Sequence, residues 1–181
     1  MDMTGSRQIA ASRQAVWAAL NDPDILRQCI TGCEVLEMQS PTDMTARVKL
    51  AVGPVRATFN GKVKLTDIDP PNGYRIVGEG NGGEAGFAKG GATVRLADVG
   101  RGSLMTYDVK AFVGGKLAQL GGRLIDSTAK RFADEFFAKF AQLVGGAPAD
   151  ASAAATPAAS RTRLGWLRRW FGRRSKAGAG A

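Results

Sequence analysis

The sequence predicts an α+β fold in which a curved antiparallel sheet packs around one long C-terminal helix. Alternating apolar and polar residues between positions 46 and 113 are typical of half-buried antiparallel strands. Apolar residues then recur at helical spacing between positions 116 and 144. Capping signals near the N-terminus add two short helices. The predicted order is therefore a strand, two short helices, a run of strands and one long helix.

The two short helices are expected directly after the first strand. Ser12 is a residue type that caps helices, and apolar residues follow it as far as Leu20. The stretch from Asn21 to Pro23 opens the second helix, because proline favours the first helical position. This second helix should end near Cys29.

Strands fill the middle of the chain. Positions 46, 48, 50 and 52 are apolar, whereas Arg47 and Lys49 between them are charged, and the alternation returns from Val55 to Leu65. Pro70-Pro71-Asn72-Gly73 predicts a turn. Further strands are expected at Tyr74–Gly78, about Phe87–Ala97 and Leu104–Val113.

A helix from about Lys116 to Val144 is expected to lie across this sheet with one apolar face. Gly121 and Gly122 fall inside it, where each glycine costs about 1 kcal/mol relative to alanine. We interpret this pair as a bend or as the close approach of another backbone. Helix and sheet enclose an apolar space, and periodicity alone does not show whether that space is filled or hollow.

The composition excludes several classes of function. The 181 residues include no histidine, which excludes Ser-His-Asp and Cys-His catalysis and the commonest metal ligand. The two cysteines, Cys29 and Cys33, are too few for a disulfide framework or a zinc site, and we interpret them as buried thiols, with redox sensing as a minor alternative. No pair of carboxylates is placed for acid–base catalysis. We therefore predict no catalytic residue and no metal site.

Residues 78–83 match the dinucleotide-binding pattern G-x-G-x-x-G. That pattern requires a parallel strand before it and a helix after it, whereas here a second glycine-rich stretch and a strand follow. We interpret the region as a mobile or bulged strand connection over a cavity mouth. No apolar segment resembles a signal peptide or a membrane-spanning helix, so the expected location is the cytoplasm.

Three segments are expected: a folded domain over 1–146, an Ala/Pro linker over 147–160 and a basic amphipathic tail over 161–181. The formal net charge is +9, and seven basic residues against one acidic residue follow position 144. On a helical wheel the tail places its large apolar residues opposite most of its arginines, which is typical of a helix lying on an anionic membrane. A nucleic-acid-binding tail and a merely solvated one are the alternatives; the aromatic residues favour the membrane, and we expect no nucleic-acid partner. The predicted membrane-binding residues are Leu164, Trp166, Leu167, Arg168, Arg169, Trp170, Phe171, Arg173 and Arg174.

Motifs along residues 1–144 resemble CoxG, the family of the G subunit of carbon monoxide dehydrogenase. They are Met1–Gly5, Val16–Pro23, Cys29–Glu34, Val52–Val55, Asp69–Tyr74, Gly86–Gly91 and Gly114–Gly121. Thr31 departs from the family pattern, which has proline in the cysteine loop. The resemblance implies a START-like (SRPBCC) helix-grip fold and a non-enzymatic accessory protein of a molybdenum hydroxylase of the aerobic carbon monoxide dehydrogenase type. It also implies a non-covalently bound respiratory quinone, menaquinone or ubiquinone, and peripheral attachment to the inner face of the cell membrane.

An elongated cavity between the sheet and the long helix is the expected site for this hydrophobic ligand. Large apolar side chains are directed at one space, and nearby glycines withdraw side-chain volume from it. The expected lining residues are Phe59, Phe87, Met105, Tyr107, Leu120, Gly121, Leu124, Phe132 and Phe136. Two other hypotheses stay open. One is an assembly or maturation chaperone of the dehydrogenase that carries no ligand, and the other is an enzyme, which the missing histidine disfavours.

Overall fold

The computed structural model describes residues 1–145. The predicted linker and membrane-binding tail therefore lie outside the described residues. The elements are β1 (Asp2–Ile9), α1 (Arg13–Leu20), α2 (Pro23–Cys29), β2 (Cys33–Met38), β3 (Asp43–Val52), β4 (Val55–Asp69), β5 (Gly73–Asn81), the 3₁₀ turn η1 (Gly83–Ala85), β6 (Phe87–Val99), β7 (Gly102–Gly114), the 3₁₀ turn η2 (Gly115–Leu120) and α3 (Gly122–Gly145).

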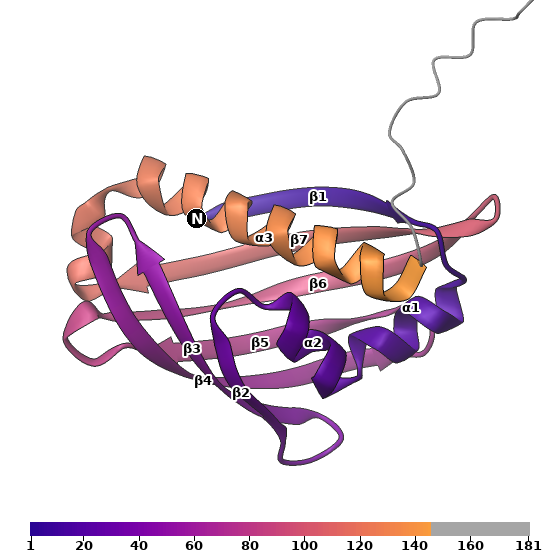
Figure 1. Cartoon of the computed structure of the whole chain (residues 1–181), viewed down its shortest axis with the longest axis horizontal. Helices are drawn as coiled ribbons and strands as arrows, with labels where there is room; N and C mark the ends of the chain where they lie inside the picture. The colour runs from indigo at the N-terminus through magenta and orange to yellow at the C-terminus, as the bar shows by residue number, and fades with distance from the viewer. Residues whose placement is uncertain (146–181) are drawn as a thin grey trace, which may run out of the picture. The chain divides into compact units, whose positions relative to one another are not determined.

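All seven strands form one antiparallel sheet in the order β1-β7-β6-β5-β4-β3-β2. After β1 the chain crosses to the opposite edge through α1 and α2, and it then returns strand by strand in hairpins from β2 to β7. α3 lies across one face of the sheet, with α1 and α2 next to its C-terminal half (Figure 1). The predicted α+β arrangement of a curved antiparallel sheet and a long C-terminal helix is confirmed.

Both short helices begin at the capping residues expected from the sequence. The Ser12 Oγ accepts a hydrogen bond from the Ala15 N–H at 3.2 Å. A carboxylate oxygen of Asp22 accepts from the N–H groups of Asp24 and Ile25 at 2.9 and 3.3 Å, and Pro23 occupies the first helical position. These side chains satisfy backbone donors that have no partner within the helix.

The strand β2 was not predicted from the sequence. Its residues alternate poorly between apolar and polar types, and its pairing with β3 shifts register between Cys33 and Val35. A bulge of this kind places two residues of one strand opposite one residue of its partner and breaks the period of two on which strand prediction rests.

The long helix begins later than predicted. Residues 115–120 form the 3₁₀ turn η2, and α3 begins at Gly122. Gly121 between them has φ of +85°, a backbone conformation that glycine adopts readily and other residues rarely do. Added Cβ atoms at Gly121 and Gly122 would meet no atom within 4 Å, so the predicted close approach of another backbone is wrong. The glycine pair separates two helical segments instead.

Two apolar clusters form the core at opposite ends of the sheet. The larger cluster joins α1, α2 and the C-terminal half of α3 to the sheet, and its fully buried side chains include Val16, Met105 and Phe140. The smaller cluster lies beside η1 and η2 and includes the buried residues Phe59 and Leu117. α3 is therefore packed on the sheet toward both of its ends.

Replacing Phe140 by alanine should destabilise the fold strongly. Phe140 is 0% exposed and stacks on Phe136 with ring centroids 5.7 Å apart, so its removal leaves a cavity as well as lost apolar contacts. We expect Phe140→Ala to lower the free energy of unfolding by about 3–5 kcal/mol in urea titrations followed by circular dichroism. Leu143→Ala, one turn away on a side chain that is 46% exposed, is the matched control and should cost far less. Equal losses in the two variants would contradict the assignment of Phe140 to the core.

Candidate functional site

Between the two clusters, three positions on the inner face of the sheet are glycines and have no side chain. Phe59, Gly61 and Leu65 of β4 share this face, because strand side chains alternate, and Phe59 and Leu65 are buried in the smaller and the larger cluster. Gly61 pairs with Gly80, and the neighbouring Gly78 pairs with Val63 on the same face. We call Gly61, Gly78 and Gly80 the glycine strip.

No side chain of α3 covers the glycine strip closely. An added Cβ atom at Gly80 would meet only a backbone oxygen of β4 at 4.0 Å, and at Gly61 only backbone oxygens at 3.5 and 3.9 Å. At Gly78 it would meet a backbone oxygen at 3.4 Å and a methyl group of Val63 at 3.5 Å. All of these atoms belong to neighbouring strands. The space above the strip, on the side of α3, is therefore open to a ligand group.

A cavity of about 340 Å³ opens at the seam between β1 and α3. Residues of β1 from Asp2 to Gly5 form one side, Asp126 and Lys130 of α3 the other, and Tyr107 of β7 contributes to the wall. The Tyr107 ring lies against the backbone of Gly5, where a side chain would collide with it. Tyr107 also stacks on Phe137 with ring centroids 5.1 Å apart, which fixes its position below α3.

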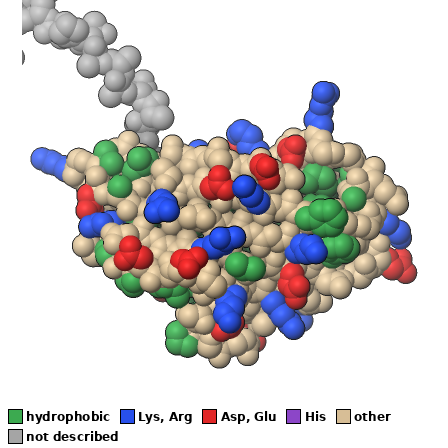
Figure 2. Space-filling model, turned by 180° about the vertical axis from the view of Figure 1, so that it is seen from behind, with side chains coloured by type: hydrophobic (Ala, Val, Ile, Leu, Met, Phe, Trp, Pro, Cys, Tyr) green, Lys and Arg blue, Asp and Glu red, His purple; other side chains and the backbone are tan. Residues whose placement is uncertain are grey.

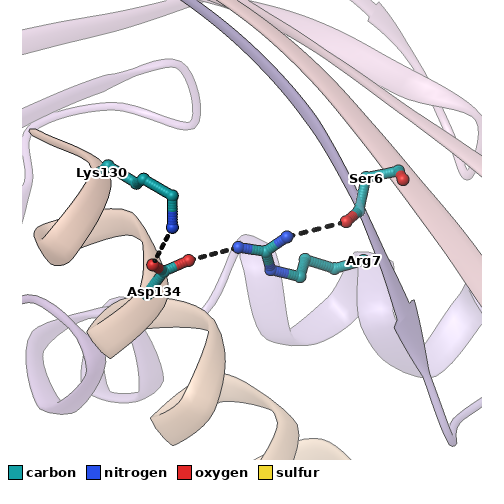
Figure 3. A network of polar contacts seen from close by, with 4 residues as sticks. All are labelled: Ser6, Arg7, Lys130 and Asp134. Carbon is teal, nitrogen blue, oxygen red and sulfur yellow. Dashed lines mark hydrogen bonds and ion pairs between the residues drawn. The ribbon is translucent and has the colours of Figure 1, made fainter. Parts of the chain in front are cut away.

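One ion pair, between Arg7 and Asp134, ties β1 to α3 in the wall of this cavity (Figure 3). The Arg7 guanidinium donates to the carboxylate of Asp134, and Lys130 Nζ lies 2.7 Å from the other carboxylate oxygen. Arg7 also donates to the Ser6 carbonyl at 3.0 Å and lies 5.3 Å from the ring centroid of Phe137. The hydrogen bond and charge of Lys130, followed by those of Arg7, hold the pKa of the Asp134 carboxyl below its usual range.

The structure divides the predicted cavity residues among different environments. Met105 and Phe136 belong to the larger cluster, whereas Phe59 and Leu120 belong to the smaller one. Of the predicted residues, Tyr107 alone lines the seam cavity. Four of these five side chains are therefore packed in the two core clusters, and only Tyr107 faces a cavity.

The remaining predicted residues lie around the helix. Leu124 approaches the β3–β4 turn, where a methyl group of Leu124 lies 2.8 Å from the position of an added Cβ at Gly53. Phe132 is half-buried, with the Arg131 guanidinium 5.2 Å from its ring centroid. Gly121 is exposed at the start of the helix.

Phe87 corrects the prediction, because it lies on the face of the sheet that points away from α3. It is 40% exposed, and its ring packs against Phe112, which is 57% exposed. Buried Val94 and Leu96 show that the even-numbered positions of β6 face inward, which turns Phe87 outward. The sequence indicated this orientation, because the even positions of β6 are apolar and Phe87 is at an odd position. Phe87 was assigned to the cavity because its side chain is large and apolar.

The sequence indicated that glycines reduce side-chain volume near the cavity, but it did not identify the pairing that forms the glycine strip or the Arg7–Asp134 ion pair. The glycine-rich sequence suggests a mobile connection at Gly78 and Gly80, but both lie within the regular strand β5, and only η1 forms the connection to β6. The sequence did contain a signal: Gly78 and Gly80 are two residues apart, so in a strand they lie on the same face. Arg7 and Asp134 are 127 positions apart, and no local pattern connects them.

The cysteine loop is a packed corner that contacts α3. Cys29 is 0% exposed, and burial raises the pKa of its thiol. Burial also raises the pKa of Cys33, whose Sγ donates to the Val35 carbonyl at 3.4 Å. Thr31, at the position that departs from the expected proline, donates a hydrogen bond from Oγ1 to Glu135 of α3 at 2.6 Å. Raised pKa values keep both sulfurs protonated near neutral pH, as packed thiols are.

Comparisons with known proteins agree with this architecture. A family model described as the G subunit of carbon monoxide dehydrogenase (CoxG) matches residues 5–145. The chain is similar to a conserved protein from Geobacillus kaustophilus, with 30% identity, a TM-score of 0.76, and coverage of 81% of this chain and 96% of that one. A START superfamily protein from Mycobacterium smegmatis matches with 12% identity and a TM-score of 0.62, covering 80% and 97%. A protein from Thermus thermophilus matches with 14% identity and a TM-score of 0.61, covering 80% and 97%. No curated protein matches the sequence. The fold is START-like, as expected.

Removing the Asp134 charge should change how stability depends on pH. The folded pKa of Asp134 lies below its unfolded value, so its carboxylate stabilises the fold above about pH 4, and this contribution is lost as the pH falls through the depressed pKa. We expect Asp134→Asn to be less stable than the parent at about pH 7, and the difference in urea midpoint to shrink by about pH 3. Asp126→Asn, which changes the same charge on the same cavity wall, should behave like the parent. A difference between parent and Asp134→Asn that stays constant over this range would contradict the role of the ion pair.

Proposed function

We propose that this chain, which belongs to the CoxG family of carbon monoxide dehydrogenase G subunits, is an accessory protein. It binds a hydrophobic ligand between its sheet and α3. The ligand is a respiratory quinone, menaquinone or ubiquinone. The partner is a molybdenum hydroxylase of the carbon monoxide dehydrogenase type, which the protein links to the cytoplasmic face of the membrane. Its role is binding and presentation, with no chemical step of its own.

The open glycine strip is the observation that carries this proposal. The helix is packed at both ends, and the three glycines of the inner face leave room between these ends for an apolar group. An isoprenoid chain placed there would leave water, and each Å² of apolar surface removed from water contributes about 25 cal/mol. Small-molecule sites are commonly concave, mostly apolar and supplied with a few polar groups.

The seam cavity supports the placement of a quinone head group. A quinone carries two carbonyl oxygens that accept hydrogen bonds. The Tyr107 hydroxyl and the Lys130 ammonium group are donors in the wall of this cavity, and Arg7 lies beside them. In this arrangement the head group lies at the seam and the tail extends over the glycine strip.

Filling the glycine strip should prevent ligand binding without unfolding the protein. Gly80 has ordinary strand geometry and open space above it, so Gly80→Leu places an isobutyl group where the ligand tail would lie. We expect at least about tenfold weaker binding of decylubiquinone in isothermal titration calorimetry and loss of lipid that co-purifies with the parent, measured by mass spectrometry of extracts. Gly121→Leu is a poorer test, because its backbone φ of +85° strains any side chain.

The control for this variant is Val77→Ile. It also adds apolar volume to β5, but on the opposite face of the sheet, and it should bind decylubiquinone like the parent. Thermal melts followed by circular dichroism show whether each variant is folded. No saturable binding by the parent, or equal binding by folded Gly80→Leu, would refute the ligand site.

Attachment to the membrane rests on the sequence of the tail alone. Within residues 1–145, none of the helices has the length and apolar composition needed to cross a bilayer. Tryptophans at the boundary between headgroups and acyl chains and arginines on anionic lipids would hold the protein at the surface.

Replacing both tail tryptophans should weaken this attachment. We expect the full chain carrying Trp166→Ser and Trp170→Ser to co-sediment several-fold less with vesicles that contain about one third phosphatidylglycerol. The parent should bind pure phosphatidylcholine vesicles less well, and added salt should reduce its binding to anionic ones. Unchanged sedimentation of the variant, or parent binding that does not respond to salt, would count against a membrane-bound tail.

A further inference from the structure

The face of the sheet that points away from α3 contains a larger hollow, of about 970 Å³. Two rows of paired residues cross it. One row runs Thr45, Lys62, Glu79, Lys89, Phe112, and the other runs Asp43, Lys64, Val77, Gly91, Lys110, Asp2. Figure 2 views the molecule from this side and shows Lys and Arg side chains interspersed with apolar ones and carboxylates.

Positive charge predominates around this hollow. Its cationic lining residues are Lys62, Lys64, Arg75, Lys89 and Lys110. In the part of the chain that the structure describes, no carboxylate oxygen lies within 4.0 Å of any of these five groups. The lining also has three carboxylates, Asp2, Asp43 and Glu79. The hydroxyls of Ser40 and Thr42, which donate to Asp43 at 2.6 and 2.9 Å, and the charge of Lys64 lower the pKa of the Asp43 carboxyl. Five cations against three carboxylates leave the lining positive. The hollow therefore suits an anionic partner.

Apolar side chains are exposed in and beside the same hollow. Val77 is 45% exposed near its centre, next to Gly91, which contributes no side chain. Phe112 is 57% exposed, and Lys89 Nζ lies 5.7 Å from its ring centroid. Exposed apolar groups with a charged rim are the usual anatomy of a protein interface.

The mixture of charges in the hollow favours a protein over a membrane. The lining includes the carboxylates of Asp2, Asp43 and Glu79, which an anionic bilayer would repel and which a protein surface of mixed charge can accommodate. A projecting segment of a protein can enter the hollow, place an apolar side chain over Val77 and set its carboxylates against the lysines.

We propose that this outer face docks an acidic surface of the partner enzyme, with an apolar projection seated over Val77 and Gly91. This inference rests on the proposed function, because it takes the partner to be the carbon monoxide dehydrogenase-type enzyme. Beyond the proposed function, it specifies which surface of this protein contacts the enzyme and predicts that the contacting surface of the enzyme is acidic. It also leaves α3 and the seam cavity uncovered, so that docking and ligand exchange use opposite faces of the sheet.

The test measures binding of the full chain to the purified carbon monoxide dehydrogenase-type enzyme of the same organism by surface plasmon resonance. Lys64→Gln with Lys110→Gln removes two charges that flank the centre of the hollow. Phe112→Ser, as a second variant, removes the apolar contact. We expect each to raise the Kd at least about tenfold, and added salt to weaken parent binding more than binding of the charge variant.

The matched control is Lys116→Gln with Lys139→Gln, which removes the same charge from exposed positions outside the hollow and should change the Kd by less than about twofold. Equal affinity of parent, charge variant and Phe112→Ser would overturn the docking face while leaving the proposed function standing. No binding by the parent would overturn the enzyme as partner, and the calorimetric test of the ligand site would still stand separately. If the charge variant binds the enzyme normally but no longer binds phosphatidylglycerol vesicles, the face contacts the membrane and the proposal is overturned.

Discussion

The organisation of this protein depends on how α3 is fixed to the sheet. Phe140 anchors its C-terminal half in the larger cluster, and Leu120 and Ile125 pack around its start in the smaller one. Between these anchors three inward positions of the sheet are glycines, and added Cβ atoms there would meet no atom of α3 within 4 Å. The fold is stabilised at both ends of the helix, and the proposed ligand space lies between them.

The two tasks that we propose fall on opposite faces of the sheet, because side chains alternate along each strand. Inward positions build the clusters and the glycine strip, and outward positions build the cationic hollow. Val77 and Gly78 are neighbours in sequence but belong to different faces. A substitution in β5 is therefore expected to affect the proposed ligand space at an even position and the proposed docking face at an odd one.

Much of this fold could be predicted from local patterns. The caps at Ser12 and Asp22 and the alternation in β3 and β4 depend on neighbouring residues, and those elements were found where expected. The bulge in β2 and the outward turn of Phe87 depend on pairing with other strands. The Arg7–Asp134 pair depends on the packing of α3 against β1. For the site, the large apolar side chains and the loss of volume at glycines were identifiable from the sequence, whereas the strand pairing that brings Gly61, Gly78 and Gly80 together on one face was not.

The glycines of β5 and β6 have a consequence for the thickness of the molecule. Gly78 and Gly90 pair with each other on the inner face, yet their main-chain atoms also form part of the floor of the outer hollow. At this point the sheet consists of backbone atoms alone, with no side chain on its inner face. A group bound inside and a group seated outside would be separated there by backbone atoms alone.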